Sequence, residues 1–91
     1  ERALKVAPRN PSVQDTVGWI LVEQGQLKRG LDLLTQAVSR APKSTSIRYH
    51  HAAALARTGD KAQARKALEK LLADTPQFPE AGAAKALLKT L

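Results

Sequence analysis

The sequence predicts an all-α protein, an α-solenoid in which antiparallel helix pairs stack beside one another. Pro8, Pro42 and Pro76 are spaced 34 residues apart, and Gly25 and Gly59 share this spacing. A fixed period of this length is typical of a helical repeat in which each unit is one helix pair. The composition agrees: Leu and Ala dominate, and the 91 residues include one Trp, one Tyr and one Phe, a mixture that favours helices over sheets.

Residues 1–6 have the pattern of a helix end, so residues 1–10 are expected to be the end of a preceding repeat helix and its turn. The first complete unit is expected over 11–44, with helices at 11–24 and 27–40. Its apolar residues recur at the i, i+3, i+4, i+7 spacing of one helix face. These positions are Val13, Val17, Ile20, Leu21, Leu27, Leu31, Leu34 and Val38.

The second unit is expected over 45–78, with helices at 45–58 and 61–74. Residues 79–91 are expected to carry a C-terminal capping helix over 79–90, since the end of a solenoid needs one polar outer face. The apolar positions of these three helices are Ile47, Ala52, Leu55, Ala64, Leu68, Leu71, Leu72, Ala81, Ala84, Leu88 and Leu91.

The helix ends carry residues that suit them. Gly25 and Gly59 each stand between two helical stretches, where a left-handed residue is needed and glycine takes it without strain. Asn10 and Ser44 are expected to cap the first helix of each unit. Asp60 is expected to cap the second helix of the second unit, with a glutamine three residues later in a capping-box pattern.

A 34-residue helix–turn–helix unit that ends in proline resembles the tetratricopeptide repeat. The pattern of that family is W-x2-L-G-x2-Y, then A-x3-F, then P. The matching positions are Gln14, Val17, Gly18, Leu21, Gly30, Leu34 and Pro42 in the first unit and Arg48, His51, Ala52, Leu55, Ala64, Leu68 and Pro76 in the second.

The chain departs from this pattern at its large positions. Gln14 and Arg48 stand where the family has Trp, and His51 stands where it has Leu. The small-residue positions are kept, so each helix pair is expected to pack closely. The departures therefore predict unusual details of core packing within an intact repeat.

The resemblance implies a right-handed superhelix whose concave groove is lined by the first helix of each pair. It also implies a non-catalytic scaffold that holds a partner protein as an extended or helical peptide in that groove. The groove positions that it implies are Ser12, Asp15, Trp19, Val22, Glu23, Ser46, Tyr49, Ala53 and Arg57.

Within this groove we expect Trp19 and Tyr49 to be anchors, because aromatic side chains carry much of the energy of interfaces. Asp15, Glu23 and Arg57 are expected to set the charge preference. A packing role for Trp19 between the helices is an open alternative. The Lys and Asn with which this family clamps a C-terminal carboxylate are missing from the matching groove positions, so chaperone tails are not expected as partners.

Two segments suggest a closer resemblance. Residues 15–21 and 47–51 resemble the last repeats of bacterial repeat lipoproteins of exosortase-linked export systems, the PEP-CTERM type. This implies a larger bacterial protein involved in export or exopolysaccharide assembly. It would be periplasmic or anchored to the outer membrane, although the chain itself does not fix a compartment.

A basic helical module that binds nucleic acid is the alternative function, because the net charge is +7. However, single-strand binders interleave aromatic residues with basic ones, and here the basic residues are scattered, mostly on the expected second helices. Nucleic acid is therefore not the partner that the sequence favours. The basic residues considered are Lys28, Arg29, Arg40, Lys43, Arg57, Lys61, Arg65, Lys66 and Lys70.

No catalytic, cofactor or metal site is expected. The chain has no Cys, and the side chains of His50 and His51 point about 100° apart on a helix, so they do not converge on one ligand. No stretch approaches the roughly 18 apolar residues of a membrane span. Ala3, Leu4 and Val6 would form an exposed apolar edge if an earlier helix is missing, which predicts weak self-association.

Overall fold

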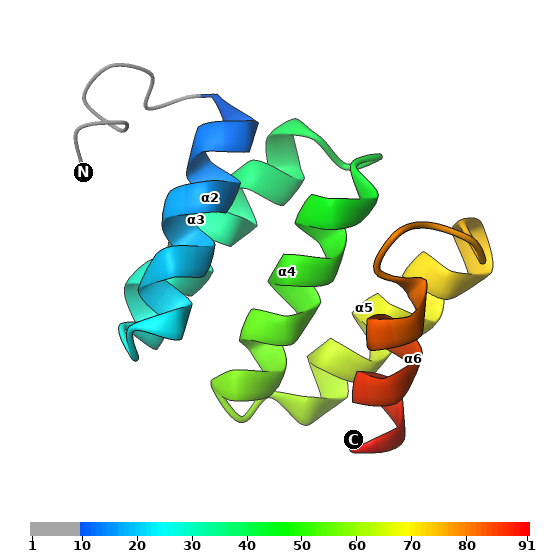
Figure 1. Ribbon diagram of the computed structural model, residues 1–91. Coiled ribbons are helices and arrows are strands. Elements are labelled where there is room, and N and C mark those ends of the chain that lie inside the picture. The colour runs from blue at the N-terminus through cyan, green and yellow to red at the C-terminus, as the bar shows by residue number, and fades with distance from the viewer. Residues whose placement is uncertain (1–9) are drawn as a thin grey trace.

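The computed structural model describes residues 10–91, so the partial helix predicted over 1–6 and the apolar edge around Leu4 lie outside the described residues. Within that range the chain is all-α, with helices and no strand (Figure 1). The helices are α2 (Pro11–Glu23), α3 (Leu27–Arg40), α4 (Thr45–Arg57), α5 (Lys61–Asp74) and α6 (Ala81–Lys89).

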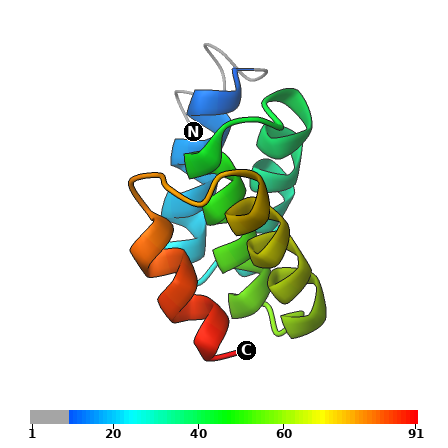
Figure 2. The ribbon, with the colours of Figure 1, turned by 90° about the vertical axis from the view of Figure 1, so that its right-hand side faces the viewer.

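The helices lie in two layers. Figure 2 shows α2, α4 and α6 in one layer and α3 and α5 in the other. Each helix packs against the next one in the chain, and α2 also contacts α4 within its own layer. This confirms the predicted solenoid of antiparallel helix pairs.

The boundaries of α2 to α5 lie within one residue of those predicted. Helix α6 begins two residues later than expected, at Ala81, because Pro79 and Glu80 form a turn. The Ala81 N–H closes this turn on the carbonyl of Phe78 at 3.0 Å, and the first helical bond runs from the Ala84 N–H to the carbonyl of Glu80.

The turns follow the sequence signals. Gly25 and Gly59 have φ angles of 87° and 93°, the left-handed conformation expected at these positions. In each case the next residue donates its N–H back across the turn, Gln26 to the carbonyl of Leu21 and Asp60 to that of Leu55. This Schellman-type closure satisfies carbonyls at the helix end.

The predicted caps of α2, α4 and α5 are confirmed. Asn10 Oδ1 accepts from the N–H groups of Ser12 and Val13, Ser44 Oγ accepts from Ile47 N, and Asp60 Oδ1 accepts from Gln63 N. Only half of the predicted capping box forms at Asp60. Its own N–H is already bonded within the Gly59 turn and is not available to the glutamine.

The core is completed from one unit to the next. Val22 and Leu34 of the first helix pair are buried together with Ala54 of α4. In the same way, Leu68 of the second pair is buried with Ala84 of α6. Because each pair needs the following first helix to cover it, α6 is part of the core that closes the second pair.

One predicted apolar stripe is covered only in part. On α2, Leu21 is buried, whereas Ile20 leaves 49% of its surface exposed. Both were predicted to belong to the same apolar face. The 100° turn between neighbouring helical residues separates them, and only Leu21 is buried.

Candidate partner-binding surface

The layer of first helices carries a cluster of ring and charged side chains where α2 meets α4. Trp19 lies one helical turn after Asp15 and one turn before Glu23, so all three share one face of α2. The facing positions of α4 are those of Tyr49, His50, Ala53 and Arg57. We call the cluster of Asp15, Trp19, Glu23, Tyr49, His50 and Arg57 the ring cluster.

His50 is at the centre of the ring cluster. Its imidazole stacks on Trp19 with ring centroids 4.7 Å apart and planes at 23°. The Tyr49 ring also contacts His50, with ring centroids 5.7 Å apart and planes tilted by 48°. Offset and tilted arrangements in this distance range are favourable for aromatic pairs, so three rings from two helices form one continuous surface.

A short polar contact holds this histidine in place. His50 Nδ1 lies 2.7 Å from Asp15 Oδ1, and both side chains are mostly buried. Because an ionised carboxylate only accepts hydrogen bonds, Nδ1 carries the proton that it donates to Asp15. The contact joins residues 35 positions apart and fixes the plane of the ring against Trp19.

Arg57 covers the other end of the cluster. Its guanidinium lies 5.1 Å from the centre of the Trp19 ring, a cation–π distance. It also donates to Glu23 Oε2 at 3.1 Å. Both charged side chains are about half exposed, so the ion pair adds little stability, but it places a cation on the face of the indole.

Two residues predicted to line the groove are buried instead. Val22 is 2% exposed and packs with Leu34 and Ala54, and Ala53 is 6% exposed. Both occupy the side of their helix that turns toward the neighbouring helices. They support the surface from below and offer almost nothing for a partner to touch.

The two serines differ in their surroundings. Ser12 is exposed at the start of α2. Ser46 is partly buried and donates to Glu80 Oε2 at 3.0 Å, so it belongs to the contact between α4 and the start of α6. The structure therefore places Asp15, Trp19, Glu23, Tyr49 and Arg57 together and leaves both serines at the margin.

His50 is the residue that sequence reasoning missed, because it was considered only as half of a histidine pair. The two imidazoles do diverge, since His50 faces α2 whereas His51 lies beside Thr35 of α3 at 3.4 Å. Over residues 10–91 no group of three or more His, Cys, Asp or Glu side chains could hold a metal ion. The signal that could have found His50 is its position four residues after Ser46, on the groove face.

The exposed basic residues gather elsewhere. Most lie on α3 and α5, in the layer opposite the ring cluster. Arg57 instead lies on α4 above Trp19, and Lys85 and Lys89 are exposed on α6. Among the described helices, none has both the length and the apolar character that crossing a membrane requires.

Comparison with known families gives a match. A family model described as tetratricopeptide repeat matches residues 21–88, which is 68 of the 91 residues. The match spans all of α3, α4 and α5, the end of α2 and most of α6. Comparison with curated proteins finds no matching relative.

Proposed function

Because the chain belongs to the tetratricopeptide repeat family, whose repeats generally mediate protein–protein interaction, we propose that its first-helix layer binds a segment of a partner protein. The proposed occupant is an extended or helical peptide that lies across α2 and α4. The observation that carries this proposal is the ring cluster, in which Trp19, His50 and Tyr49 form one partly exposed surface. The family is in general a non-catalytic scaffold, and we propose no reaction for this chain.

The anchors of the proposed surface are Trp19 and Tyr49. Trp19 has two roles, since it packs against the core cluster around Leu34 and presents a partly exposed ring to solvent. Tyr49 brings a phenol hydroxyl beside an apolar ring, a combination that is common at interfaces. Both rings are held by neighbours before any partner arrives, so little conformational entropy is lost on binding.

The charges of the surface are largely paired within it. Asp15 contacts His50, and Glu23 contacts Arg57. We therefore propose that the rings of this surface select apolar and aromatic side chains of the partner segment. The charged residues contribute only at the edge of the surface. Ser12 and Ser46 are proposed as marginal contacts, and Val22 and Ala53 as support below the surface.

A random-peptide selection against the wild-type protein tests the proposal. Trp19 is the only tryptophan of the chain, so its fluorescence reports directly on a peptide bound beside it. We expect Tyr49→Ala to weaken the selected peptides by about tenfold or more, with the helical circular dichroism unchanged. Lys66→Ala, on an exposed site of α5 in the other layer, is the matched control and should bind normally.

The opposite pattern would reject the proposal. If the selected peptides bound Tyr49→Ala normally and were lost in Lys66→Ala, the binding surface would be on the second helices. Trp19→Ala is a second variant. Circular dichroism must be measured first for both variants, because Trp19 and Tyr49 each also pack against a core cluster.

Nucleic-acid binding would use a different surface from the one proposed here. The exposed cations of α3 and α5 lie in the layer opposite the ring cluster, so charge and stacking rings are not combined on one face as single-strand binding requires. A steep loss of affinity with salt would revive the alternative.

Three narrower statements stay predictions. A role in export or exopolysaccharide assembly and a cell-envelope location rest on the resemblance of residues 15–21 and 47–51 alone. Localisation of the full-length protein tests both. Weak self-association through residues 1–6 is tested by sedimentation of the chain with and without an added upstream repeat.

A further inference from the structure

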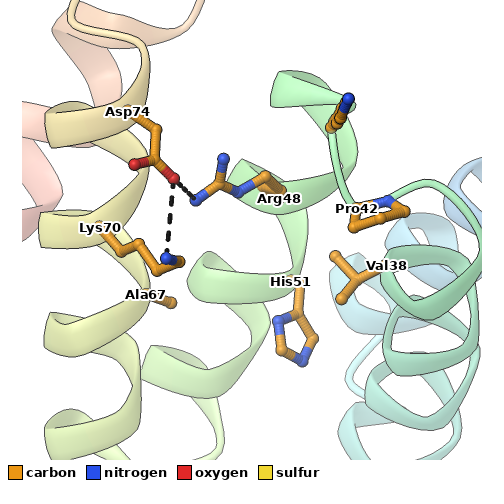
Figure 3. Close-up of a pocket in the computed structure, with 8 residues that line it drawn as sticks. Val38, Pro42, Arg48, His51, Ala67, Lys70 and Asp74 are labelled. Carbon is orange, nitrogen blue, oxygen red and sulfur yellow. Dashed lines mark hydrogen bonds and ion pairs between the residues drawn. The ribbon is translucent and has the colours of Figure 1, made fainter.

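A separate cleft lies on the side of α4 that faces α3 and α5 (Figure 3). It has a volume of about 360 Å³, at the small end of the range for ligand pockets. Val38 and Pro42 form one wall, Ala67 stands on the opposite wall, and Arg48 and His51 project from α4 between them. The ring cluster uses the other side of α4, so the two surfaces are independent.

The cleft occurs at the positions where the chain departs from its family pattern. Arg48 stands at the Trp position and His51 at the Leu position of the second unit, and both line the cleft. The Arg48 side chain extends toward α5 instead of filling the space between the helices. In the first unit the same Trp position holds Gln14, which is 1% exposed and bonded to Gln36 at 3.0 Å.

The cleft has more basic side chains than acidic ones. Arg48 Nη2 donates to Asp74 Oδ2 at 3.1 Å, and Lys70 Nζ lies 3.9 Å from the same oxygen. Lys43 also lines the cleft and has no ion-pair partner among residues 10–91. The cleft is therefore lined by three cations and one carboxylate, so its net positive charge favours an anionic ligand.

Arg48 is the best placed of these cations to bind an anion. Its side chain is only 17% exposed, so a hydrogen bond to it is weakly screened by water. A guanidinium has five N–H donors in a flat fork, and Asp74 uses one of them. The remaining donors have the geometry that binds a second carboxylate through two oxygens.

His51 adds a neutral polar group. Burial lowers the pKa of His51 below its usual 6.5, so the ring is uncharged at neutral pH. Thr35 Oγ1 donates to the carbonyl of Leu31 at 2.8 Å and can only accept from His51 Nε2 at 3.4 Å. His51 Nε2 therefore carries the proton, and Nδ1 is left as a hydrogen-bond acceptor.

We propose that this cleft binds a small organic monocarboxylate with an apolar body. The carboxylate is held by Arg48 with Lys43 and Lys70 nearby, and the apolar body lies against Val38, Pro42 and Ala67. A phosphate dianion fits less well, because it has no apolar part to pack against Val38, Pro42 and Ala67. The ligand is either a free acid or the C-terminal residue of a peptide, which present the same chemistry.

The test is a titration followed by two-dimensional amide NMR. N-acetyl-L-leucine is the probe, and we expect shifts confined to residues around the cleft with a Kd on the order of 1 mM. N-acetyl-L-leucine amide lacks the charge and should leave the spectrum unchanged. Acetate lacks the apolar body, phosphate tests for a general anion site, and neither should reproduce the shifts.

Variants separate the site from a non-specific effect. Arg48→Gln should weaken the probe by about tenfold or more. Arg29→Gln, at an exposed site near the start of α3 that does not line the cleft, is the matched control and should leave binding unchanged. Ala67→Leu keeps every charge and fills the cleft, so it should abolish binding even if Arg48→Gln disturbs folding.

Four results would overturn the proposal: no shifts up to about 20 mM probe, equal binding of the amide, equal binding of acetate or phosphate, or normal binding by Ala67→Leu. N-acetyl-Ala-Ala-Leu with a free carboxylate distinguishes the sources. Tighter binding than N-acetyl-leucine supports a peptide C-terminus, and binding of N-acetyl-leucine alone supports a free acid.

Discussion

The two helix pairs have the same length and register but pack differently. In the first pair α2 and α3 cross at Gly18 and Gly30, and a methyl group added to Gly30 would lie 2.5 Å from Val22 Cγ2 and 2.6 Å from the Gly18 carbonyl oxygen. In the second pair the equivalent positions are Ala52 and Ala64, both fully buried. The second pair therefore carries two methyl groups at its crossing, and α4 and α5 pack less extensively than α2 and α3.

The same contrast holds at the Trp position of the family pattern. Gln14 is enclosed in the first pair, whereas Arg48 runs out to Asp74 and leaves a cleft in the second. One repeat register thus accommodates a tight pair and a more open pair. The 34-residue period thus specifies where the helices lie along the chain. The residues at a few small and polar positions decide how closely the two helices of a pair approach each other.

The largest expected effects come from the leucines at the centre of each pair. Leu34 and Leu68 are fully buried, and replacing either by Ala should lower the free energy of unfolding by about 2–5 kcal/mol. We expect Leu34→Ala to cost more, because the tightly packed first pair can relax less around the cavity. Urea unfolding followed by circular dichroism measures both, and a larger loss for Leu68→Ala would contradict the comparison.

The glycine crossing gives the next largest effect. Gly30→Ala should destabilise the protein by about 1–3 kcal/mol, because the new methyl group meets backbone atoms that cannot move aside. Gly82→Ala is the matched control in α6, where an added methyl group contacts nothing within 4 Å. It should be neutral or stabilise by up to about 1 kcal/mol. A neutral Gly30→Ala in thermal melts would show that the first pair is not tight.

Helix capping differs between the pairs by a smaller amount. The second helix of the second pair is capped by Asp60, whereas Gln26 makes no side-chain cap at the start of α3. Asp60→Ala should cost about 1 kcal/mol. Gln26→Asp should stabilise by about 0.5–1 kcal/mol, and no gain in the urea midpoint would show that α3 does not lack a cap.

The smallest expected effect is the pH dependence of stability that comes from His51 in the second pair. Burial lowers the pKa of His51 in the folded state, so the unfolded chain binds that proton more tightly. The stability from neutral His51 is complete above pH 6.5 and is lost as pH falls through the lower, folded-state pKa. His51→Gln should flatten this part of the unfolding curve against pH. Equal curves for His51→Gln and wild type would contradict the prediction.

The sequence by itself determined the local features of this protein. Gly25 and Gly59 mark turns because the backbone there has φ angles near +90°, which glycine adopts without strain. Asn10, Ser44 and Asp60 cap helices because their side-chain oxygens reach N–H groups two or three residues away. Such features depend on neighbours in the chain, so the helix boundaries and the 34-residue repeat could be predicted from residue spacing, and the repeat resembles that of the family.

Only the tertiary structure decided which side chains meet. Asp15 and His50 are 35 positions apart, Val22 is buried although it shares a helix with Trp19, and the cleft needs α3, α4 and α5 together. These outcomes depend on the rotation of each helix about its axis and on the distance between helices. A small change in either moves a side chain from surface to core, and the repeat period does not specify it.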